Sequence, residues 1–468
     1  MKFLLTMAGL GGLLYGIDFG AIAAAMPYIK SMGMFTDAQV SWIVGAVMFG
    51  GILSSLSAGV LCDRLGRKKM IVAAAAMFLV AIPIVCFSGG LLWVMMAGRV
   101  LQGMSAGYMA VVMPMYLTET LPPEIRGRGT GIFQFCLWSG LVGAALVGLV
   151  VAGWLGAADA EGIANETKDL AWKINFWWTL APVAVLFVGA LFLPESPVWK
   201  KSLELRAKSL EVRGKSLELR AKSLEVRGKS LELDGDEMLQ APSSKLQALL
   251  QRKYVVPFLL AVAVLTFNKT TGMSSITSYA VVIFHKAGFT GSLGNVGDLS
   301  IKLVSMITTL VAASLVDRKG RTWLLKVGTS GMTVGLFAIG AVLFAIEKCG
   351  VTASPVSGGV CLIAFFVMEI FYSLGPGICV WLVLSELMPM RIRANGMAIA
   401  LFMNQLTAWG LASSFLPWVN RWGWYSMFFF FAANGVLYFL IACLIPETKG
   451  KSLEELEHLF DGKGKGRT

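Results

Sequence analysis

The sequence predicts an all-α membrane protein with twelve transmembrane helices in two related halves. Of its 468 residues, 56% are hydrophobic and only 15% are charged, and the mean hydropathy is +0.71. A soluble domain cannot bury that much apolar surface, so the bilayer must solvate it. Short motifs recur in the same order in both halves, which in a membrane protein is typical of transporters built from repeats.

The individual helices are predicted from apolar stretches of roughly 20 residues, enough to cross about 30 Å of hydrocarbon. We predict spans at residues 3–27, 40–62, 69–90, 92–118, 128–153, 173–193, 254–285, 297–316, 323–346, 357–388, 395–418 and 424–445. The corresponding domains are an N-terminal bundle (1–199), a cytoplasmic linker (200–252), a C-terminal bundle (253–446) and a cytoplasmic tail (447–468).

Three motifs of the N-terminal half have counterparts in the C-terminal half. They are the basic turns Asp63-Arg64-Leu65-Gly66-Arg67-Lys68 and Asp317-Arg318-Lys319-Gly320-Arg321-Thr322, the pairs Glu119 with Arg126 and Glu386 with Arg393, and the segments Pro194-Glu195-Ser196-Pro197 and Pro446-Glu447-Thr448-Lys449. Three motifs repeated in one order indicate that one half is a copy of the other.

The distribution of charge predicts the orientation in the membrane. The net charge is +12, and the basic residues gather in alternate loops, in the central segment and in the tail, whereas acids such as Asp37, Asp159 and Asp298 occupy the loops between. By the positive-inside rule, both termini and the central segment are cytoplasmic. The charge therefore reflects topology, and we expect no nucleic-acid partner. The seven cysteines and two histidines have no paired spacing, so we expect no metal and no cofactor.

The central linker contains a tandem repeat. Residues 201–214 recur letter for letter at 215–228, and a third copy begins at residue 229. An apolar stripe with alternating steps of four and three, beginning at Leu203, predicts an amphipathic helix. The segment is either a regulatory or partner-binding helix or a tandem duplication in a permissive linker. We assign it no chemistry.

Two charged residues lie deep in predicted spans, at matching depths. Asp18 lies nine residues before Pro27, at the outer end of the first span, and Arg99 lies eight residues past the outer start of the fourth. At about 1.5 Å per residue, both lie roughly 12–14 Å below the outer surface, so their side chains can meet. An aspartate beside an arginine is ionised, and it takes up a proton when the two separate. The pair is either a proton carrier or a permanent bridge between helices.

Three other ionisable residues lie within predicted spans. Lys302 is about five residues from the outer end of its span, and we expect its ammonium group to reach water. Lys269 lies near the middle of the seventh span, and Glu369 lies in the tenth. Lys269 either binds a negatively charged group of a solute or forms an ion pair with Glu369.

One more run of residues completes a set of motifs that extends along the chain. Leu101-Gln102-Gly103-Met104-Ser105-Ala106-Gly107, followed by Tyr116, Glu119 and Arg126, resembles the signature of the sugar porters of the major facilitator superfamily. The basic turns and the Pro-Glu segments are similar to other motifs of that family. The resemblance covers nearly the whole chain apart from the repeats. It implies two pseudo-symmetric six-helix bundles, a central site between them, and alternating access.

The resemblance also implies gating networks and a proton site. In that family, the basic turns and the two glutamates form cytoplasmic salt bridges that hold the bundles together when the cavity opens outward and release when it opens inward. Here the corresponding residues are Asp63, Arg64, Arg67, Glu119, Arg126 and Glu195, and Asp317, Arg318, Arg321, Glu386, Arg393 and Glu447. Asp18 and Arg99 stand where proton-coupled members carry an aspartate and an arginine.

This chain matches only some of the solute-binding positions that the resemblance implies. Gln134, Trp381 and Asn404 stand at positions that contact sugar in the family. Where the family has a glutamine pair, a glycine, an asparagine and two tyrosines in the seventh span, this chain has Asn268, Lys269, Gly272, Ser274, Ser278 and Tyr279. A tryptophan next to Asn404 is replaced by Gln405. Loss of amides that pair with sugar hydroxyls changes selectivity sharply.

We therefore expect a proton-coupled importer of a sugar or polyol, with Asp18 carrying the proton and Arg99 tuning it. The expected solute contacts are Gln134, Asn268, Lys269, Ser274, Tyr279, Trp381, Asn404 and Gln405. One alternative is an importer of a sugar acid or other organic anion, with Lys269 as the counter-charge. A lower-ranked alternative is a sensor that binds solute without transporting it. No nucleophile–base pair or phosphate-binding loop is visible, so we expect no enzyme. We expect a monomer in a bacterial inner membrane.

Overall fold

The computed structural model describes residues 2–122, 126–160, 162–205, 208, 252–388 and 393–449, and the side chains of 126–130, 252–254, 317, 385 and 393–395 also lie outside the description. Within these ranges the chain forms 12 helical spans long and apolar enough to cross a membrane, so the predicted fold class is confirmed. The predicted linker helix and the tail beyond residue 449 lie outside the described residues, apart from a short helical stretch at 197–205.

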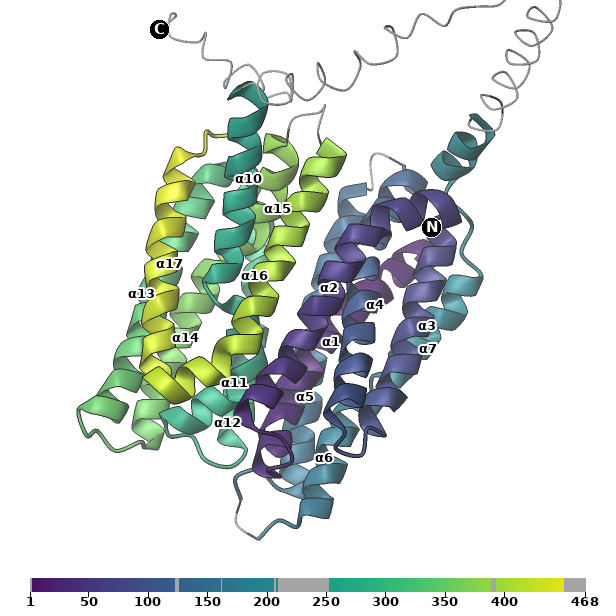
Figure 1. Ribbon diagram of the computed structural model, residues 1–468. Coiled ribbons are helices and arrows are strands. Elements are labelled where there is room, and N and C mark those ends of the chain that lie inside the picture. Colours follow the sequence, from purple (N-terminus) through teal and green to yellow (C-terminus); the bar gives the residue numbers. More distant parts are fainter. Residues whose placement is uncertain are drawn as a thin grey trace, which may run out of the picture.

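The helices form two bundles that stand side by side (Figure 1). The first contains α1 (Lys2–Ser31), α2 (Asp37–Leu65), α3 (Arg67–Cys86), α4 (Leu92–Thr120), α5 (Arg126–Leu155), α6 (Asn165–Trp177) and α7 (Leu180–Leu191). The second contains α10 (Arg252–Thr270), α11 (Met273–Ala287), α12 (Leu293–Lys319), α13 (Arg321–Lys348), α14 (Pro355–Leu374), α15 (Pro376–Leu387), α16 (Arg393–Trp422) and α17 (Trp424–Leu444).

Three spans that the sequence predicted as continuous are each built from two helices. The sixth is α6 and α7, the seventh is α10 and α11, and the tenth is α14 and α15. Gly272 ends the first half of the seventh span in the left-handed region, with φ +78°, which glycine adopts without strain. In the tenth span, Pro376 lacks a backbone N–H and restricts the residue before it, so the helix is interrupted at Gly375. Interrupted helices frequently line binding sites in transporters.

Glycines allow α1 to pack closely against α5. Gly12 and Gly16 lie one turn apart on α1, and a Cβ on either would overlap a backbone carbonyl oxygen of α5, that of Phe133 or of Leu137. Small residues at such spacing let transmembrane helices approach backbone to backbone, where van der Waals contact stabilises the pair. This packing positions the inward face of α1, which carries Asp18.

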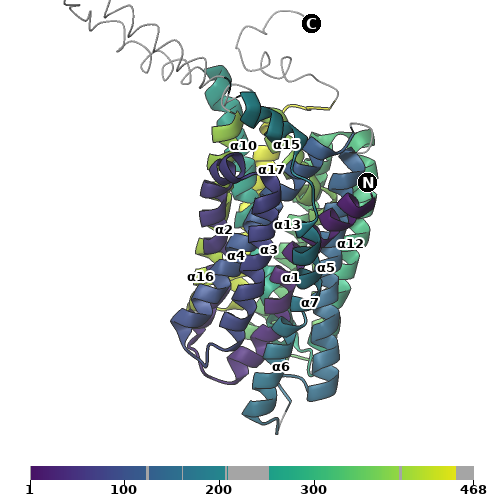
Figure 2. The same ribbon diagram turned by 90° about the vertical axis from the view of Figure 1, so that its right-hand side faces the viewer.

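The molecule has two distinguishable ends. The basic end carries the turns between α2 and α3 and between α12 and α13, and the opposite end carries the α1–α2 and α5–α6 connections. In Figure 2, α10 and α15 lie near one end and α6 near the other. The bundles touch along α2 with α16, α5 with α12, and α1 with α11.

Candidate functional site

Asp18 of α1 and Arg99 of α4 meet in the interior of the first bundle. The Nη1 atom of Arg99 lies 3.5 Å from Oδ1 of Asp18, and the two residues are 1% and 0% exposed. The predicted contact between them is therefore confirmed. Arg99 also donates a hydrogen bond to Oε1 of Gln102 at 2.8 Å, and its guanidinium group lies over the ring of Phe176 at 5.6 Å. The sequence signature contained Gln102, but nothing in it assigned this role.

The ion pair is incomplete. Asp18 Oδ2 and Arg99 Nε have no hydrogen-bond partner among the described residues. A buried ion pair contributes net stability only when its geometry is good and its remaining polar atoms are satisfied. A contact at 3.5 Å with unsatisfied atoms on both sides therefore favours an exchangeable pair over a structural bridge. Protonation of Asp18 would remove the attraction to Arg99 altogether.

Lys269 is the cation nearest the break between α10 and α11. Its Nζ atom donates to Oγ of Ser274 at 3.0 Å, across the turn that contains Gly272. Among the described residues it forms no ion pair with a carboxylate, so the Lys269–Glu369 bridge left open by the sequence is not formed. The two predicted solute residues Lys269 and Ser274 are thus brought together, and the cation is left without a counter-charge from the described part of the chain.

Three other predicted solute residues contact protein groups. Asn404 donates to the backbone oxygen of Leu265 at 2.8 Å and joins α16 to α10. Tyr279 donates to Oγ of Ser41 in the other bundle at 3.3 Å. Gln405 packs against Gly51 of α2, where a Cβ would overlap its Nε2 atom. These side chains hold helices together in this conformation.

The remaining predicted solute residues make fewer contacts with other protein groups. Asn268 is buried, and its Oδ1 atom has no partner in the part of the chain described. Gln134 lies on α5 one turn from Trp138, which faces α11. Trp381 of α15 is 49% exposed. The structure therefore places the eight residues on α5, α10, α11, α15 and α16, with direct contact between Lys269 and Ser274.

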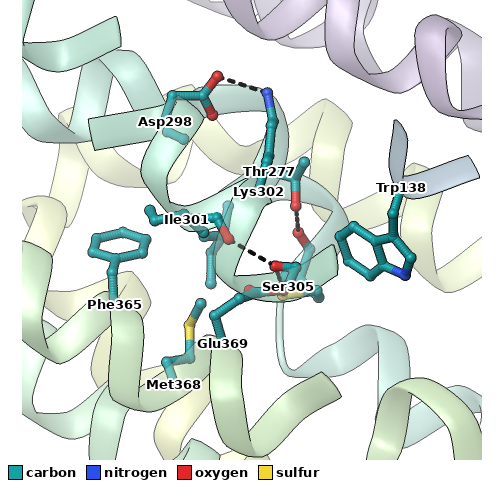
Figure 3. Close-up of a pocket in the computed structure, with 12 residues that line it drawn as sticks. Trp138, Thr277, Asp298, Ile301, Lys302, Ser305, Phe365, Met368 and Glu369 are labelled. Atoms are coloured by element: carbon teal, nitrogen blue, oxygen red, sulfur yellow. Dashed lines mark hydrogen bonds and ion pairs between the residues drawn. The ribbon is translucent and has the colours of Figure 1, made fainter. Parts of the chain in front are cut away.

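Lys302 does not reach water, contrary to the prediction. It is 2% exposed, and its Nζ atom lies 2.6 Å from Oδ2 of Asp298, one turn earlier on α12. Asp298, which the sequence assigned to an outer loop, is itself buried inside that helix. The ion pair satisfies the ammonium group without water. Figure 3 shows the pair beside Ser305 and Glu369.

A glutamate network organises the basic end of the first bundle. Arg67 forms ion pairs with Glu119 at 2.9 Å and with Asp63 at 3.3 Å. Oε1 of Glu195 accepts hydrogen bonds from the backbone N–H groups of Arg67 at 2.9 Å and Lys68 at 3.0 Å, at the start of α3. Carboxylates are stabilising at helix N-termini, where backbone N–H groups have no partner within the helix.

The second bundle repeats this arrangement. Arg321 Nε lies 3.3 Å from Glu386 Oε1, and the Glu447 carboxylate accepts the backbone N–H groups of Arg321 at 2.9 Å and Thr322 at 3.1 Å. Burial raises the pKa of Glu447, but backbone hydrogen bonds, including that from Lys449, outweigh it and hold the pKa below the usual range. Glu447 is therefore ionised at neutral pH and caps α13.

Several predicted network residues are placed differently or not at all. The side chains of Arg64 and Arg318 are exposed and form no ion pair with any described residue. The side chains of Arg126, Asp317 and Arg393 lie outside the described residues. The ion pairs described at the basic end stay within one bundle, so they do not join the two halves.

Hydrogen bonds between the bundles gather in the half of the molecule away from the basic turns. Ser41 accepts from Tyr279 and, at 3.0 Å, from the backbone N–H of Leu416. Other hydrogen bonds in this half run from Asn420 to Asp37, from the Gly291 N–H to Asp159 and from Asn295 to the Gly148 carbonyl, and one from Ser139 to the sulfur of Met306 joins α5 to α12. In this conformation, hydrogen bonds therefore join the two bundles at the end opposite the basic turns.

Two bundles of six spans each, with interrupted spans and a buried ion pair, are typical of a secondary active transporter rather than an enzyme. A family model described as sugar (and other) transporter matches residues 4–460, and the chain belongs to this family. The arabinose-proton symporter of Bacillus subtilis is 28% identical over 97% of this chain and 93% of its own length. The galactose-proton symporter of Escherichia coli strain K12 is 29% identical over 98% and 95%.

Solved structures share the fold. The crystal structure of a D-xylose-proton symporter has a TM-score of 0.74 and 20% sequence identity, covering 96% of this chain and 99% of its own. An inward-open conformation of the xylose transporter XylE from E. coli also has a TM-score of 0.74, with 21% identity over 97% and 99%. At this identity the similarity establishes the major facilitator fold.

Proposed function

We propose that this chain is a proton-coupled symporter of a sugar or polyol that works by alternating access. The observation that carries the proposal is the buried, incomplete pair of Asp18 and Arg99. Protonation of Asp18 removes its attraction to Arg99, and deprotonation restores it, so the packing of α1 against α4 depends on the proton. Relatives named as sugar-proton symporters over nearly the whole chain support the same function.

The proposed solute site lies between the bundles. We assign solute contacts to Gln134, Asn268, Lys269, Ser274, Tyr279, Trp381, Asn404 and Gln405. Because Tyr279, Asn404 and Gln405 bond or pack against protein groups here, solute binding to them requires rearrangement of the contacts between bundles. The glutamate networks, with Arg126 in the first and Arg393 in the second, are proposed as gates.

We further propose that the basic end faces the cytoplasm, on the positive-inside rule. The hydrogen bonds at the opposite end then close the outer face, so the conformation described is inward-facing. A monomer in a bacterial cytoplasmic membrane completes this proposal.

Transport by vesicles tests the function directly. Purified protein in liposomes with an acidic exterior is expected to accumulate at least one of labelled L-arabinose, D-galactose, D-xylose or a polyol above its external concentration. A protonophore is the control, because it removes the gradient and leaves the carrier intact. Equilibration without accumulation, equal with and without the protonophore, would contradict proton coupling.

A second candidate, an importer of sugar acids, is favoured by Lys269. Its ammonium group has no carboxylate partner among the described residues and stands where neutral sugar contacts are expected. An anionic solute would supply that counter-charge. In this case gluconate or a hexuronate competes with the labelled solute.

Lys269→Gln separates the two candidates. If the solute is an anion, this variant should lose competition by gluconate by at least tenfold, because about 1.4 kcal/mol of charge interaction equals a factor of ten. Lys286→Gln, at the end of α11, is the matched control. If the wild type transports neutral sugars and gluconate does not compete, the sugar-acid importer is excluded.

A further inference from the structure

A pocket in the second bundle, away from Asp18, contains a buried carboxyl group, that of Glu369, which has no assigned role. It is enclosed by α11, α12 and α14, and Trp138 of the first bundle lies against one side (Figure 3). Glu369 lines it and is 0% exposed. The Ser373 hydroxyl lies near this carboxyl group, but Oε2 makes no well-aligned hydrogen bond, and no cation pairs with Glu369 among the described residues. An ionised carboxylate left this way is strongly disfavoured.

The hydroxyl of Ser305 links Glu369 to the backbone of α12 in either protonation state of the carboxyl group. Its Oγ atom lies 3.0 Å from the carbonyl oxygen of Ile301 and 2.5 Å from Oε1 of Glu369. A hydroxyl has one proton and cannot donate to both acceptors at once. The hydroxyl donates to Oε1 of an ionised Glu369. When Glu369 is protonated, the carboxyl group donates to Oγ instead, and the hydroxyl is free to donate to Ile301.

The surrounding charges agree with a neutral Glu369. Lys302 of α12 is the cation in the pocket, but Asp298 already neutralises it at 2.6 Å. Tyr372 lies one turn further along α14 itself. The other charged residues of the neighbouring helices lie toward helix ends. They are His285 and Lys286 on α11, Arg321, Lys326, Glu347 and Lys348 on α13, and Glu386 on α15. None of the pocket residues from α5 or α11 is an acid or a base.

We propose that Glu369 and Ser305 form a second proton-binding site, occupied in this conformation and covered from the other bundle by Trp138. When the bundles rearrange, water enters the pocket and takes the proton from the Glu369 carboxyl. The resulting carboxylate then accepts a hydrogen bond from the Ser305 hydroxyl. The transporter thus carries one exchangeable proton in each bundle. The proton site itself stands independently, and its contribution to symport rests on the function proposed above.

Infrared spectroscopy tests the site without any solute. The wild type in lipid is expected to show a protonated-carboxyl band that disappears at high pH, and Glu369→Gln should lose this band. Glu347→Gln, the same chemical change at the end of α13, should keep it, as should Asp18→Asn. Ser305→Ala leaves the carboxyl in place and should shift the band to higher frequency, because its hydrogen bond is lost. A folded Glu369→Gln protein with an unchanged band, or no shift in Ser305→Ala, would overturn the proposal.

Transport stoichiometry tests the coupling. With the membrane potential clamped to zero, two coupled protons give an accumulation ratio of about one hundred for one pH unit, and one gives about ten, since each tenfold ratio equals about 1.4 kcal/mol. Glu369→Gln should therefore lower the ratio about tenfold for whichever labelled sugar accumulates. An unchanged ratio would remove Glu369 from coupling. Failure of all sugars to accumulate would contradict the proposed function, whereas the infrared result would still decide the proton site.

Discussion

Asp18→Asn is expected to lower proton-driven accumulation about tenfold for each pH unit of imposed gradient. Asparagine has nearly the shape of a protonated aspartate but binds no exchangeable proton, so one coupled proton is lost from each cycle. A proton contributes about 1.4 kcal/mol per pH unit, which equals a tenfold concentration ratio. Exchange of labelled for unlabelled solute should persist, because it needs no net proton movement.

The measurement is steady-state accumulation in liposomes, with counterflow exchange as the companion assay. Asp169→Asn is the matched control, because Asp169 pairs with Lys173 at the start of α6, outside the buried pair. This control should accumulate solute as the wild type does. Undiminished uphill uptake by Asp18→Asn would show that Asp18 does not carry the proton. The double variant Asp18→Asn with Glu369→Gln should equilibrate solute without concentrating it.

Gly16→Val should abolish folding of the first bundle or lower its thermal midpoint strongly. A side chain at Gly16 would overlap the carbonyl oxygen of Leu137, and neither backbone can yield without separating α1 from α5. Overpacking of a well-packed core typically costs about 1–3 kcal/mol and more when backbone must move. Displacement of α1 would also carry Asp18 away from Arg99.

Thermal unfolding of the detergent-purified protein, followed by size-exclusion fluorescence, measures the effect. Gly153→Val on α5 is the matched control, because a Cβ there meets nothing within 4 Å. Its midpoint should stay near that of the wild type. Equal midpoints for the two variants would show that the close approach of α1 and α5 is not required for stability.

The fold and the ion pair could be predicted from sequence because they depend on regular geometry. Span length follows from bilayer thickness, and counting residues from each span end placed Asp18 and Arg99 at one depth. The same counting was wrong for Lys302, because burial depends on a partner as well as on depth. Asp298 lies one turn away, but its position near the predicted span end made it look like a loop residue.

Contacts between distant segments could not be predicted from a single sequence. The hydrogen bond between Ser305 and Glu369 joins residues 64 positions apart, and a serine in an apolar span carries no signal of its partner. The interruptions at Gly272 and Gly375 are similar. Glycine is common in transmembrane helices, and only tertiary packing decides whether it bends the chain.

The positions of Glu195 and Glu447 have a consequence for the evolution of the chain. Each lies just beyond the last span of its half and is bonded back to the first turn of that half's third span. Each half is therefore closed on itself before the next segment begins. Added or lost length between residues 200 and 252 is not transmitted to either bundle. We therefore expect that a fourteen-residue unit can be copied there without displacing either bundle, which favours the tandem-duplication hypothesis for the exact repeat at 201–228.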